Sequence, residues 1–432
     1  MTSDDGDHGS PPVPPSVRSA RLRQLVETGG VIAVAIMVMN VATYGFQMVA
    51  ARLLGPEQYS AVASMLALLM VVAVLQLGLQ ATAARRIAGS PGHVAQIEHG
   101  IMQVTYRAAA GVGVLMLVAA PLTWKALSLD SWVPAVECAL AAIPLTIAGG
   151  QAGILQGERR WKPLGMFYLA SGVPRVALGL AAMLIRPTEG AAMFAVLVSM
   201  WAPVLVGWWV LRRPRATGDL SEDHGLASIA RESMHGSMAL MSFLVLSNAD
   251  IMVARNVLTE RDAGLYAGGL ILTKAVLFAP QFVVVVAFPA MSSSTVQRLR
   301  ALVASLAAIA VIGTVTILGS WLLSDIAMIF VGGSEYADVE SRLWRFALLG
   351  TILATLQLLI YSVLARQHRG ATLVMWAGAV ALIVLGLQAD SLDQMITTVT
   401  SIDAIVLAAL MTVTVRDLRR TVTAEPVSVR AD

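Results

Sequence analysis

The chain has 432 residues, of which 57% are hydrophobic and 13% are charged. Soluble globular domains contain about 25% charged residues, so this composition predicts a membrane protein. The formal net charge is +3, and the basic residues fall in short clusters between apolar runs, which argues against a nucleic-acid-binding protein. The single cysteine, Cys138, excludes an intrachain disulfide.

The N-terminal segment 1–28 is polar and rich in proline near its start, which favours an extended, disordered cytoplasmic tail. No small-residue cleavage site follows the first apolar run. We therefore expect that run to stay in the protein as an uncleaved first span.

The apolar runs have the length of membrane-spanning helices, which need about 20 apolar residues each. We predict a helix for each of 12 runs between charged or turn-rich breaks: 29–50, 58–82, 103–123, 133–155, 164–185, 190–211, 235–257, 263–289, 301–323, 345–365, 371–389 and 394–415. The predicted fold class is an all-α polytopic membrane protein.

Lysine and arginine are retained on the cytoplasmic side of a membrane, so alternate loops should differ in basic content. With the N-terminus placed inside, the inner segments hold 20 basic residues. The outer segments hold seven: Arg52, Lys125, Arg186, Arg255, Arg261, Arg342 and Arg345. This asymmetry predicts a multi-pass protein of the cytoplasmic membrane with an even number of spans and both termini in the cytoplasm.

Two stretches at the outer ends of odd-numbered spans share one pattern. They are VAARLLGPEQYSAVASMLAL from Val49 and MVARNVLTERDAGLYAGGLIL from Met252. Six spans separate them, so both halves of the chain repeat in the same membrane orientation. We predict an N-lobe, a cytoplasmic linker, a C-lobe and a cytoplasmic tail, with the bounds 29–215, 216–230, 231–415 and 416–432.

Four motifs connect the chain to a known family. They are RLLGPEQY, LQGERRW, SNADIMVAR and IFVGGSEYADVESRLWRFALLG. Over residues 25–415 the sequence resembles the oligosaccharide (polysaccharide repeat-unit) flippases of the multidrug/oligosaccharidyl-lipid/polysaccharide exporter superfamily. The resemblance implies two six-helix lobes around a central cleft, as in the multidrug and toxin extrusion (MATE) transporters.

The same resemblance implies a function. Such a protein carries an undecaprenyl-diphosphate-linked oligosaccharide across the membrane by alternating access, for the assembly of a cell-envelope polysaccharide. Membrane lipid and the glycosyltransferases and polymerase of the same pathway are the partners that it implies. The chain lacks the two extra helices of the lipid II flippases, which favours a polysaccharide repeat unit as cargo.

Charged or polar residues inside the predicted spans are the candidate substrate contacts. A basic side chain at the bilayer centre costs about 2.5–3.5 kcal/mol and usually faces a bundle interior or water. Lys274 and Arg175 are such residues, and the first span adds Asn40 and Gln47. We predict all four in the cleft. The alternative for Lys274 is a structural pair with Asp250, and for Arg175 a buried pair.

Arg52 and Arg255 occupy matched positions at outer helix ends. A structural clamp is one interpretation of such an arginine with a nearby acid. The other is an outer gate in which Arg52 pairs with Glu57. In the second half, Arg255 would pair with Glu260 or Asp262. The lipid II flippases have an arginine at a similar place after the first span, so the resemblance favours a functional Arg52.

Asp250 is an acid inside the seventh span and a candidate for binding a coupling ion. The alternative is a pair with Lys274 or a hydrogen bond to another helix. We expect no cofactor, and transport coupled to H⁺, to Na⁺ or to the membrane potential. The first span has no carboxylate, unlike that of multidrug extruders with an N-lobe acid. This weakens the alternative of a multidrug or small amphipathic compound exporter.

The sequence contains no G-x-x-x-x-G-K-[ST] motif and no HExxH motif, so neither ATP hydrolysis nor a metal site is expected. The predicted outer loops are short, and we expect no catalytic residues. A membrane polymerase or glycosyltransferase is therefore the least favoured alternative. The glycines of AGGQAG, residues 148–153, predict close contact between helices.

Overall fold

The computed structural model describes residues 15–212, 226–235, 238–278, 295–364 and 369–424. Regular structure in these ranges is helical, and they contain no strand. The predicted all-α fold class is confirmed. Residues 279–294, which include the end of the predicted eighth span, lie outside the described residues.

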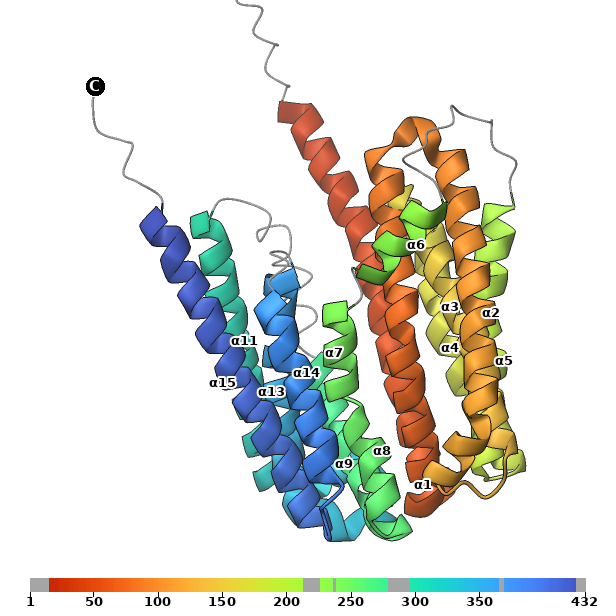
Figure 1. The fold of residues 1–432 in the computed structure, drawn as a ribbon, viewed down its shortest axis with the longest axis vertical. Coiled ribbons are helices and arrows are strands. Elements are labelled where there is room, and N and C mark those ends of the chain that lie inside the picture. Colours follow the sequence, from red (N-terminus) through yellow and green to blue (C-terminus); the bar gives the residue numbers. More distant parts are fainter. Residues whose placement is uncertain (1–14, 213–225, 236–237, 279–294, 365–368, 425–432) are drawn as a thin grey trace, which may run out of the picture.

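The first half of the chain forms one bundle of long helices, which we call the N bundle (Figure 1). Its helices are α1 (Pro15–Gly89), α2 (Val94–Ala126), α3 (Val133–Gly157), α4 (Trp161–Ile185) and α5 (Glu189–Leu211). Helix α1 packs against α3 and α4, and α5 packs against the same two helices. A short 3₁₀ turn, η1 (Pro91–His93), joins α1 to α2.

A break in α1 turns one long helix into two passes. Gly55 has a φ of 71° and a ψ of 174°, a backbone conformation that glycine adopts most readily. Pro56 follows and has no N–H to donate to the preceding turn. The break separates the predicted spans 29–50 and 58–82. We call the end of the molecule that holds Gly55 the elbow end.

The second half of the chain forms the C bundle. Its helices are α7 (Met238–Leu246), α8 (Ala249–Val257), α9 (Glu260–Phe278), α11 (Thr295–Leu322), α12 (Ser324–Val331), α13 (Leu343–Leu364), α14 (Arg369–Gly386) and α15 (Leu392–Ala424). A 3₁₀ segment, η3 (Ser334–Arg342), precedes α13. The predicted span 235–257 is two helices, because Ser247 and Asn248 interrupt it between α7 and α8.

Nine of the described helical segments are long and apolar enough to cross a membrane. One of them, Gly30–Gly89, has 60 residues and includes the break at Gly55. At 1.5 Å per residue it extends about 90 Å, long enough for two crossings of a core about 30 Å thick. The chain is a multi-pass membrane protein, and the total of twelve spans stays a prediction.

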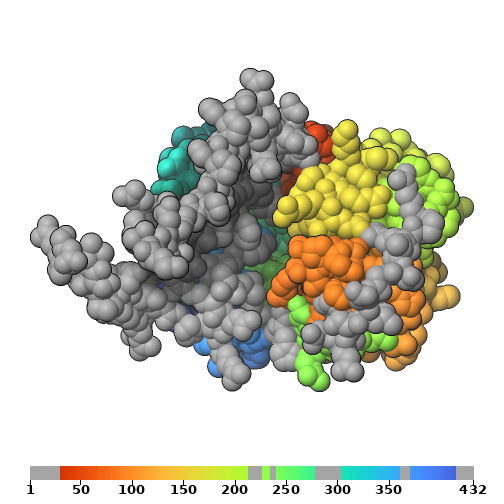
Figure 2. Space-filling model, turned by 90° about the horizontal axis from the view of Figure 1, so that it is seen from above, coloured from red at the N-terminus to blue at the C-terminus, as the bar shows by residue number. Residues whose placement is uncertain are grey.

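The two bundles meet at the elbow end and diverge toward the end where α1 begins and α15 ends (Figure 1). Contacts between them run from α1 to α7, α8, α9, α12 and η3. Viewed from the end opposite the elbow, the described parts of the two bundles occupy opposite sides of the molecule (Figure 2). The overall arrangement matches the predicted pair of lobes.

A short helix, α6 (Leu226–His235), follows the N bundle and lies across α1 and α2 (Figure 1). Its Ile229 is fully buried among Ile87 and Ile97. Glu232 forms ion pairs with Arg85 and Arg86, near the end of α1. The predicted linker 216–230 therefore ends in an amphipathic helix that is attached to the N bundle.

Glycines on α3 allow its close approach to the second pass of α1. A Cβ atom at Gly149 would lie 2.3 Å from the carbonyl oxygen of Gln76. A Cβ at Gly153 would lie 2.5 Å from the carbonyl oxygen of Gln80. The predicted close contact at this glycine motif is therefore present, and it fixes the position of Gln76 and Gln80.

Replacing Gly153 by alanine should destabilise the N bundle, because the new methyl group meets backbone that cannot move aside. Overpacking of this kind costs about 1–3 kcal/mol. We expect a lower midpoint for thermal unfolding of the purified protein in detergent. Gly111→Ala on α2 is the control, since a Cβ there meets nothing within 4 Å. Equal midpoints for the two variants would contradict the packing described.

Candidate functional site

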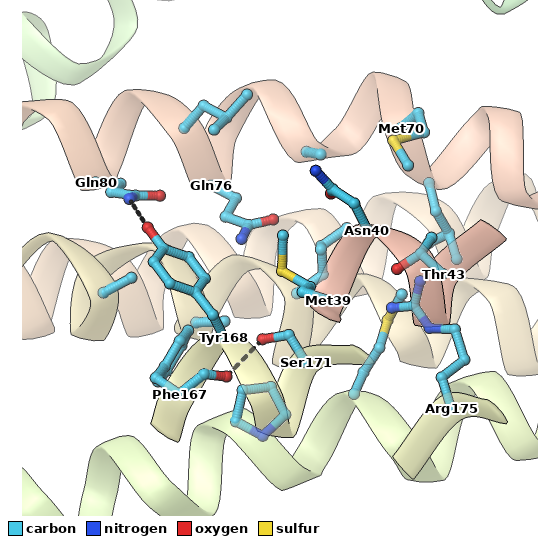
Figure 3. Close-up of a pocket in the computed structure, with 18 of the residues that line it drawn as sticks. Met39, Asn40, Thr43, Met70, Gln76, Gln80, Phe167, Tyr168, Ser171 and Arg175 are labelled. Atoms are coloured by element: carbon cyan, nitrogen blue, oxygen red, sulfur yellow. Dashed lines mark hydrogen bonds between the residues drawn. The ribbon is translucent and has the colours of Figure 1, made fainter. Parts of the chain in front are cut away.

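A cavity of about 410 Å³ lies inside the N bundle, between the two passes of α1 and helices α3, α4 and α5 (Figure 3). Most of its wall is apolar. Its polar lining residues are Asn40, Thr43, Gln76, Gln80, Tyr168, Ser171 and Arg175. No aspartate or glutamate belongs to the described residues that line this N-bundle pocket.

The close approach of α4 to α1 brings the charged and polar residues of the pocket together. A Cβ atom at Gly172 would lie 2.8 Å from the Cα atom of Met39, so the two backbones are in contact there. One turn further along each helix, Arg175 and Thr43 face the same pocket. In Figure 3 the guanidinium group of Arg175 points toward Thr43.

A hydrogen-bond network holds the amide and phenol groups at one side of the pocket. The Nε2 atom of Gln80 donates to the hydroxyl of Tyr168 at 3.2 Å and to Oε1 of Gln156 at 3.0 Å. Ser171 donates from its hydroxyl to the carbonyl of Phe167 at 2.9 Å (Figure 3). These contacts orient Gln80 and Tyr168 while leaving acceptor oxygens available to a bound molecule.

Arg175 is the cation of the pocket. Its Nε atom is buried and has no hydrogen-bond partner within the described part of the chain. A guanidinium offers five N–H donors in a planar fork that matches phosphate and carboxylate groups. Because no acid of the pocket neutralises it, Arg175 can bind an anionic group or donate hydrogen bonds to the hydroxyl oxygens of a sugar.

The four predicted substrate contacts do not lie in one place in the structure. Asn40 and Arg175 line the N-bundle pocket. Gln47 is buried, but it does not line the pocket. Lys274 lies on α9 of the C bundle, where its charge interacts with that of Asp250. A structural pair of Lys274 with Asp250 therefore stays a prediction, as does a substrate role for any of the four residues.

Sequence analysis did not single out the pocket residues Gln76, Gln80, Tyr168 and Ser171. Gln76 and Gln80 are four residues apart in an apolar run, so they share one helix face, and this spacing is a signal that could have identified them. Tyr168 and Ser171 have no comparable signal, because a tyrosine or serine in a transmembrane helix commonly serves packing or a local backbone contact.

Arg255 joins the two bundles at the elbow end. It lies on α8 of the C bundle with only 6% of its surface exposed. Its guanidinium donates to N-bundle acceptors at 2.6–3.0 Å: the carbonyls of Leu127, Ser128 and Glu57 and the hydroxyl of Ser60. We call this set of hydrogen bonds the elbow latch.

The backbone explains why a cation is held in the elbow latch. Helix α2 ends at Ala126, so the carbonyls at its end lack intrahelical donors and carry the negative end of the helix dipole. Arg255 donates hydrogen bonds to the carbonyls of Leu127 and Ser128. The side chain of Asn256 donates to the carbonyl of Ala126 at 3.0 Å.

Arg52 also joins the two bundles, but here the arginine belongs to the N bundle and its acceptor to the C bundle. It lies on α1, three residues before the break at Gly55, and its guanidinium donates to the carbonyl of Ile329 on α12. Ile329 lies in the last turn of α12, where carbonyls lack intrahelical donors. The hydroxyl of Tyr336 also reaches α1 and donates to the carbonyl of Ala51 at 3.3 Å.

Of the two predicted gate pairs, Arg255–Glu260 is present and Arg52–Glu57 is not found among the described residues. No ion pair joins Arg52 to Glu57 in the described chain; Arg52 instead donates to a carbonyl on the other bundle. Arg255 contacts Glu260 at 3.8 Å, but Glu260 is 60% exposed, and such a pair contributes little. The predicted Arg52–Glu57 pair needs correction, because a helix-end carbonyl of the opposite bundle provides the acceptor for Arg52. A gate role for these residues stays a prediction.

Residues 25–295, more than half of the chain, match the family described as polysaccharide biosynthesis protein. Uncharacterised proteins of Mycobacterium bovis and Mycobacterium tuberculosis are 24% identical to the chain over 284 residues. Those alignments cover 62% of this chain and 64% of each relative, so the chain spans less than two thirds of their length.

The fold is that of MATE transporters. An inward-facing conformation of a multidrug resistance MATE family transporter of the MOP superfamily has a TM-score of 0.69 at 13% identity, over 89% of this chain and 95% of that chain. An outward-facing conformation with the same description has a TM-score of 0.58 at 14% identity, over 90% and 97%.

A third similar structure is the MATE multidrug transporter DinF-BH in complex with R6G. Its TM-score is 0.66 at 11% identity, over 95% of this chain and 98% of that chain. These likenesses concern the fold, whereas the family match concerns the sequence. Together, the two-bundle helical fold and the match over residues 25–295 show that the chain belongs to the polysaccharide biosynthesis protein family and has a MATE-like transmembrane fold.

Proposed function

We propose that the protein is a flippase that carries a lipid-linked oligosaccharide, with a polyprenyl diphosphate such as undecaprenyl diphosphate as its anchor, across the cytoplasmic membrane. The observation that carries this proposal is the N-bundle pocket, which offers an arginine, amides and hydroxyls and no acid. Membership in a family of polysaccharide biosynthesis proteins agrees with such a cargo.

The chemistry of the pocket suits the polar part of this cargo. Arg175 would bind an anionic or polyhydroxyl group by charge-assisted hydrogen bonds. Asn40 and Gln76 would bind sugar hydroxyls, while the apolar wall would exclude water. The cavity of about 410 Å³ is small for a long oligosaccharide. We therefore assign to it only the part of the headgroup next to the lipid anchor.

The relative arrangement of the bundles supports alternating access. The elbow latch closes one end of the contact between the bundles, and the helices diverge toward the other end (Figure 1). The structure also resembles an inward-facing MATE transporter more closely than an outward-facing one. We propose that it represents an inward-open state, and that the latch must break for release on the outer side.

Orientation in the membrane follows from the distribution of positive charge. The predicted outer residues Lys125, Arg186 and Arg255 lie at or just beyond helix ends on the elbow side. Because cytoplasmic loops carry the excess of basic residues, we place the elbow end outside and both termini in the cytoplasm.

Export of organic cations is the alternative suggested by the MATE fold. An acid inside the binding pocket would favour that activity, and the described pocket has none. A transporter also needs no catalytic residues, so we propose no enzymatic activity. The glycosyltransferases and polymerase of the same pathway would supply the lipid-linked cargo and consume it.

Translocation can be measured with the purified protein in vesicles that contain a labelled polyprenyl-diphosphate sugar, as the fraction of label protected from an external reagent. Arg175→Gln removes the cation of the pocket. A hydrogen bond to a charged group contributes about 1.5–3 kcal/mol, so we expect translocation to slow at least about tenfold.

Arg107→Gln is the matched control, because Arg107 is exposed on α2 and does not line the pocket. It should leave the rate unchanged. Transport no faster than in protein-free vesicles would overturn the proposed function. If the wild-type protein moved R6G but not the labelled lipid, cation export would replace flipping of a lipid-linked oligosaccharide as the proposed function.

The elbow latch can be tested by the accessibility of a cysteine. Leu127→Cys in a Cys138→Ala background places one thiol at a position that is 2% exposed. Adding Arg255→Ala removes the latch donors and should shift the equilibrium toward an open elbow. Losing even one such hydrogen bond, worth about 1.5–3 kcal/mol, should raise the rate of labelling by a water-soluble maleimide about tenfold or more.

Arg261→Ala provides the control for this experiment. Arg261 lies on the same bundle near the elbow end, but it is exposed and pairs with Asp338 of its own bundle at 2.7 Å. It should leave the labelling rate unchanged. If Arg255→Ala labelled no faster than Arg261→Ala, the latch would not hold the elbow closed.

A further inference from the structure

Two buried acids from different helices lie together inside the C bundle. Asp250, at the start of α8, is 2% exposed, and Asp403, on α15, is 1% exposed. Their negative charges are close enough to repel each other. Tyr266 on α9 is fully buried beside them, and its hydroxyl donates to Oδ2 of Asp250 at 2.8 Å.

The acids lack the hydrogen bonds that buried carboxylates need. Both carboxyl oxygens of Asp403 and the Oδ1 atom of Asp250 have no partner among the residues that the structure describes. A buried ionised carboxylate without a donor or a counter-charge is strongly unfavourable, and in proteins such a group takes up a proton instead. Asp403 is therefore the acid that most needs a proton or another cation.

The cluster of Asp250, Asp403 and Lys274 would carry a net charge of −1 if all three side chains were ionised. Lys274 on α9 interacts with Asp250, so one cation balances one of the two acids. The other helices packed on α15 are α13 and α14, and their sequences contain no acid, lysine or histidine. Their only charged residues are Arg345 and Arg369, in the first turns of these helices.

The donor set fits a proton better than a divalent metal ion. A bound Ca²⁺ takes about six to eight oxygen ligands. The described residues here supply two carboxylates, one oxygen of which already accepts from Tyr266, and no group of three metal-ligating acids, cysteines or histidines occurs among the described residues. The ammonium group of Lys274 would also repel a metal cation.

We propose that Asp403 is a proton-binding residue of the C bundle, buried near an Asp250 carboxyl group that Tyr266 orients. The claim that this proton is the coupling ion of transport rests on the proposed function. The claim that Asp403 binds a proton does not. The site lies in the C bundle, away from the N-bundle pocket, so ion and cargo would be held by different lobes.

Infrared spectroscopy of the purified protein in lipid nanodiscs measures this proton directly, without any cargo. At neutral pH the wild-type protein should show the carbonyl stretch of a buried protonated carboxylic acid. Asp403→Asn, which is nearly isosteric, should lose this band. Asp393→Asn is the matched control on the same helix, because Asp393 is paired with Arg342 and Arg345 and should be ionised.

Three results would overturn the proposal. One is a wild-type spectrum without a protonated acid at neutral pH, and another is a band that survives Asp403→Asn. The third is a band that disappears when Na⁺ replaces a large organic cation at constant pH, since the site would then bind sodium. Vesicles that failed to translocate the labelled lipid while the band followed Asp403 would contradict the transport function and leave the proton site standing.

Discussion

The hydrogen bonds of Arg255 across the contact between the bundles are the interaction on which the rest of the structure depends. A buried guanidinium of the C bundle finds its acceptors on the N bundle, at the carbonyls of Leu127, Ser128 and Glu57 and at Ser60. Removing these partners without replacing them would leave a buried charge unpaired, so the latch is either fully formed or fully hydrated. A contact with two such alternatives suits a transporter that alternates between two states.

The elbow at Gly55 supports the same contact from the backbone. A Cβ atom at Gly264 would lie 2.3 Å from the carbonyl carbon of Pro56, so the start of α9 packs directly against the turn between the two passes of α1. Arg52 and Tyr336 add hydrogen bonds on the other side of the elbow. The turn of α1 is thus the part of the N bundle to which the C bundle is attached, and a pivot there would leave each bundle intact.

Hydropathy predicted most of the fold, because membrane-spanning helices satisfy their backbone hydrogen bonds within themselves and need only a continuous apolar run. The predicted span 133–155 corresponds to α3, and 164–185 to α4. The break between α7 and α8 was not predicted, since Ser247 and Asn248 are compatible with a helix and tertiary packing decides their conformation. The attachment of α6 to the N bundle was also missed.

The site was less predictable, because its partners are backbone atoms and residues far apart in sequence. The matched positions of Arg52 and Arg255 indicated a role at the outer helix ends, yet a search for acidic partners could not find the carbonyls that they contact. Asp403 had a signal that sequence analysis left unused, since an acid inside an apolar run is a functional candidate by default. Its proximity to Asp250 required the fold.

The central claim is that the bundles rock about the elbow, and distances between spin labels on the two bundles test it most directly. One label pair, at Lys125 and Thr259, reports on the elbow end. A second pair, at Lys162 and Gly370, reports on the opposite end. In lipid nanodiscs, the account predicts two populations whose distances change in opposite senses when the labelled polyprenyl-diphosphate sugar is added. A single distance at each end, unchanged by the lipid-linked sugar and by Arg255→Ala, would contradict it.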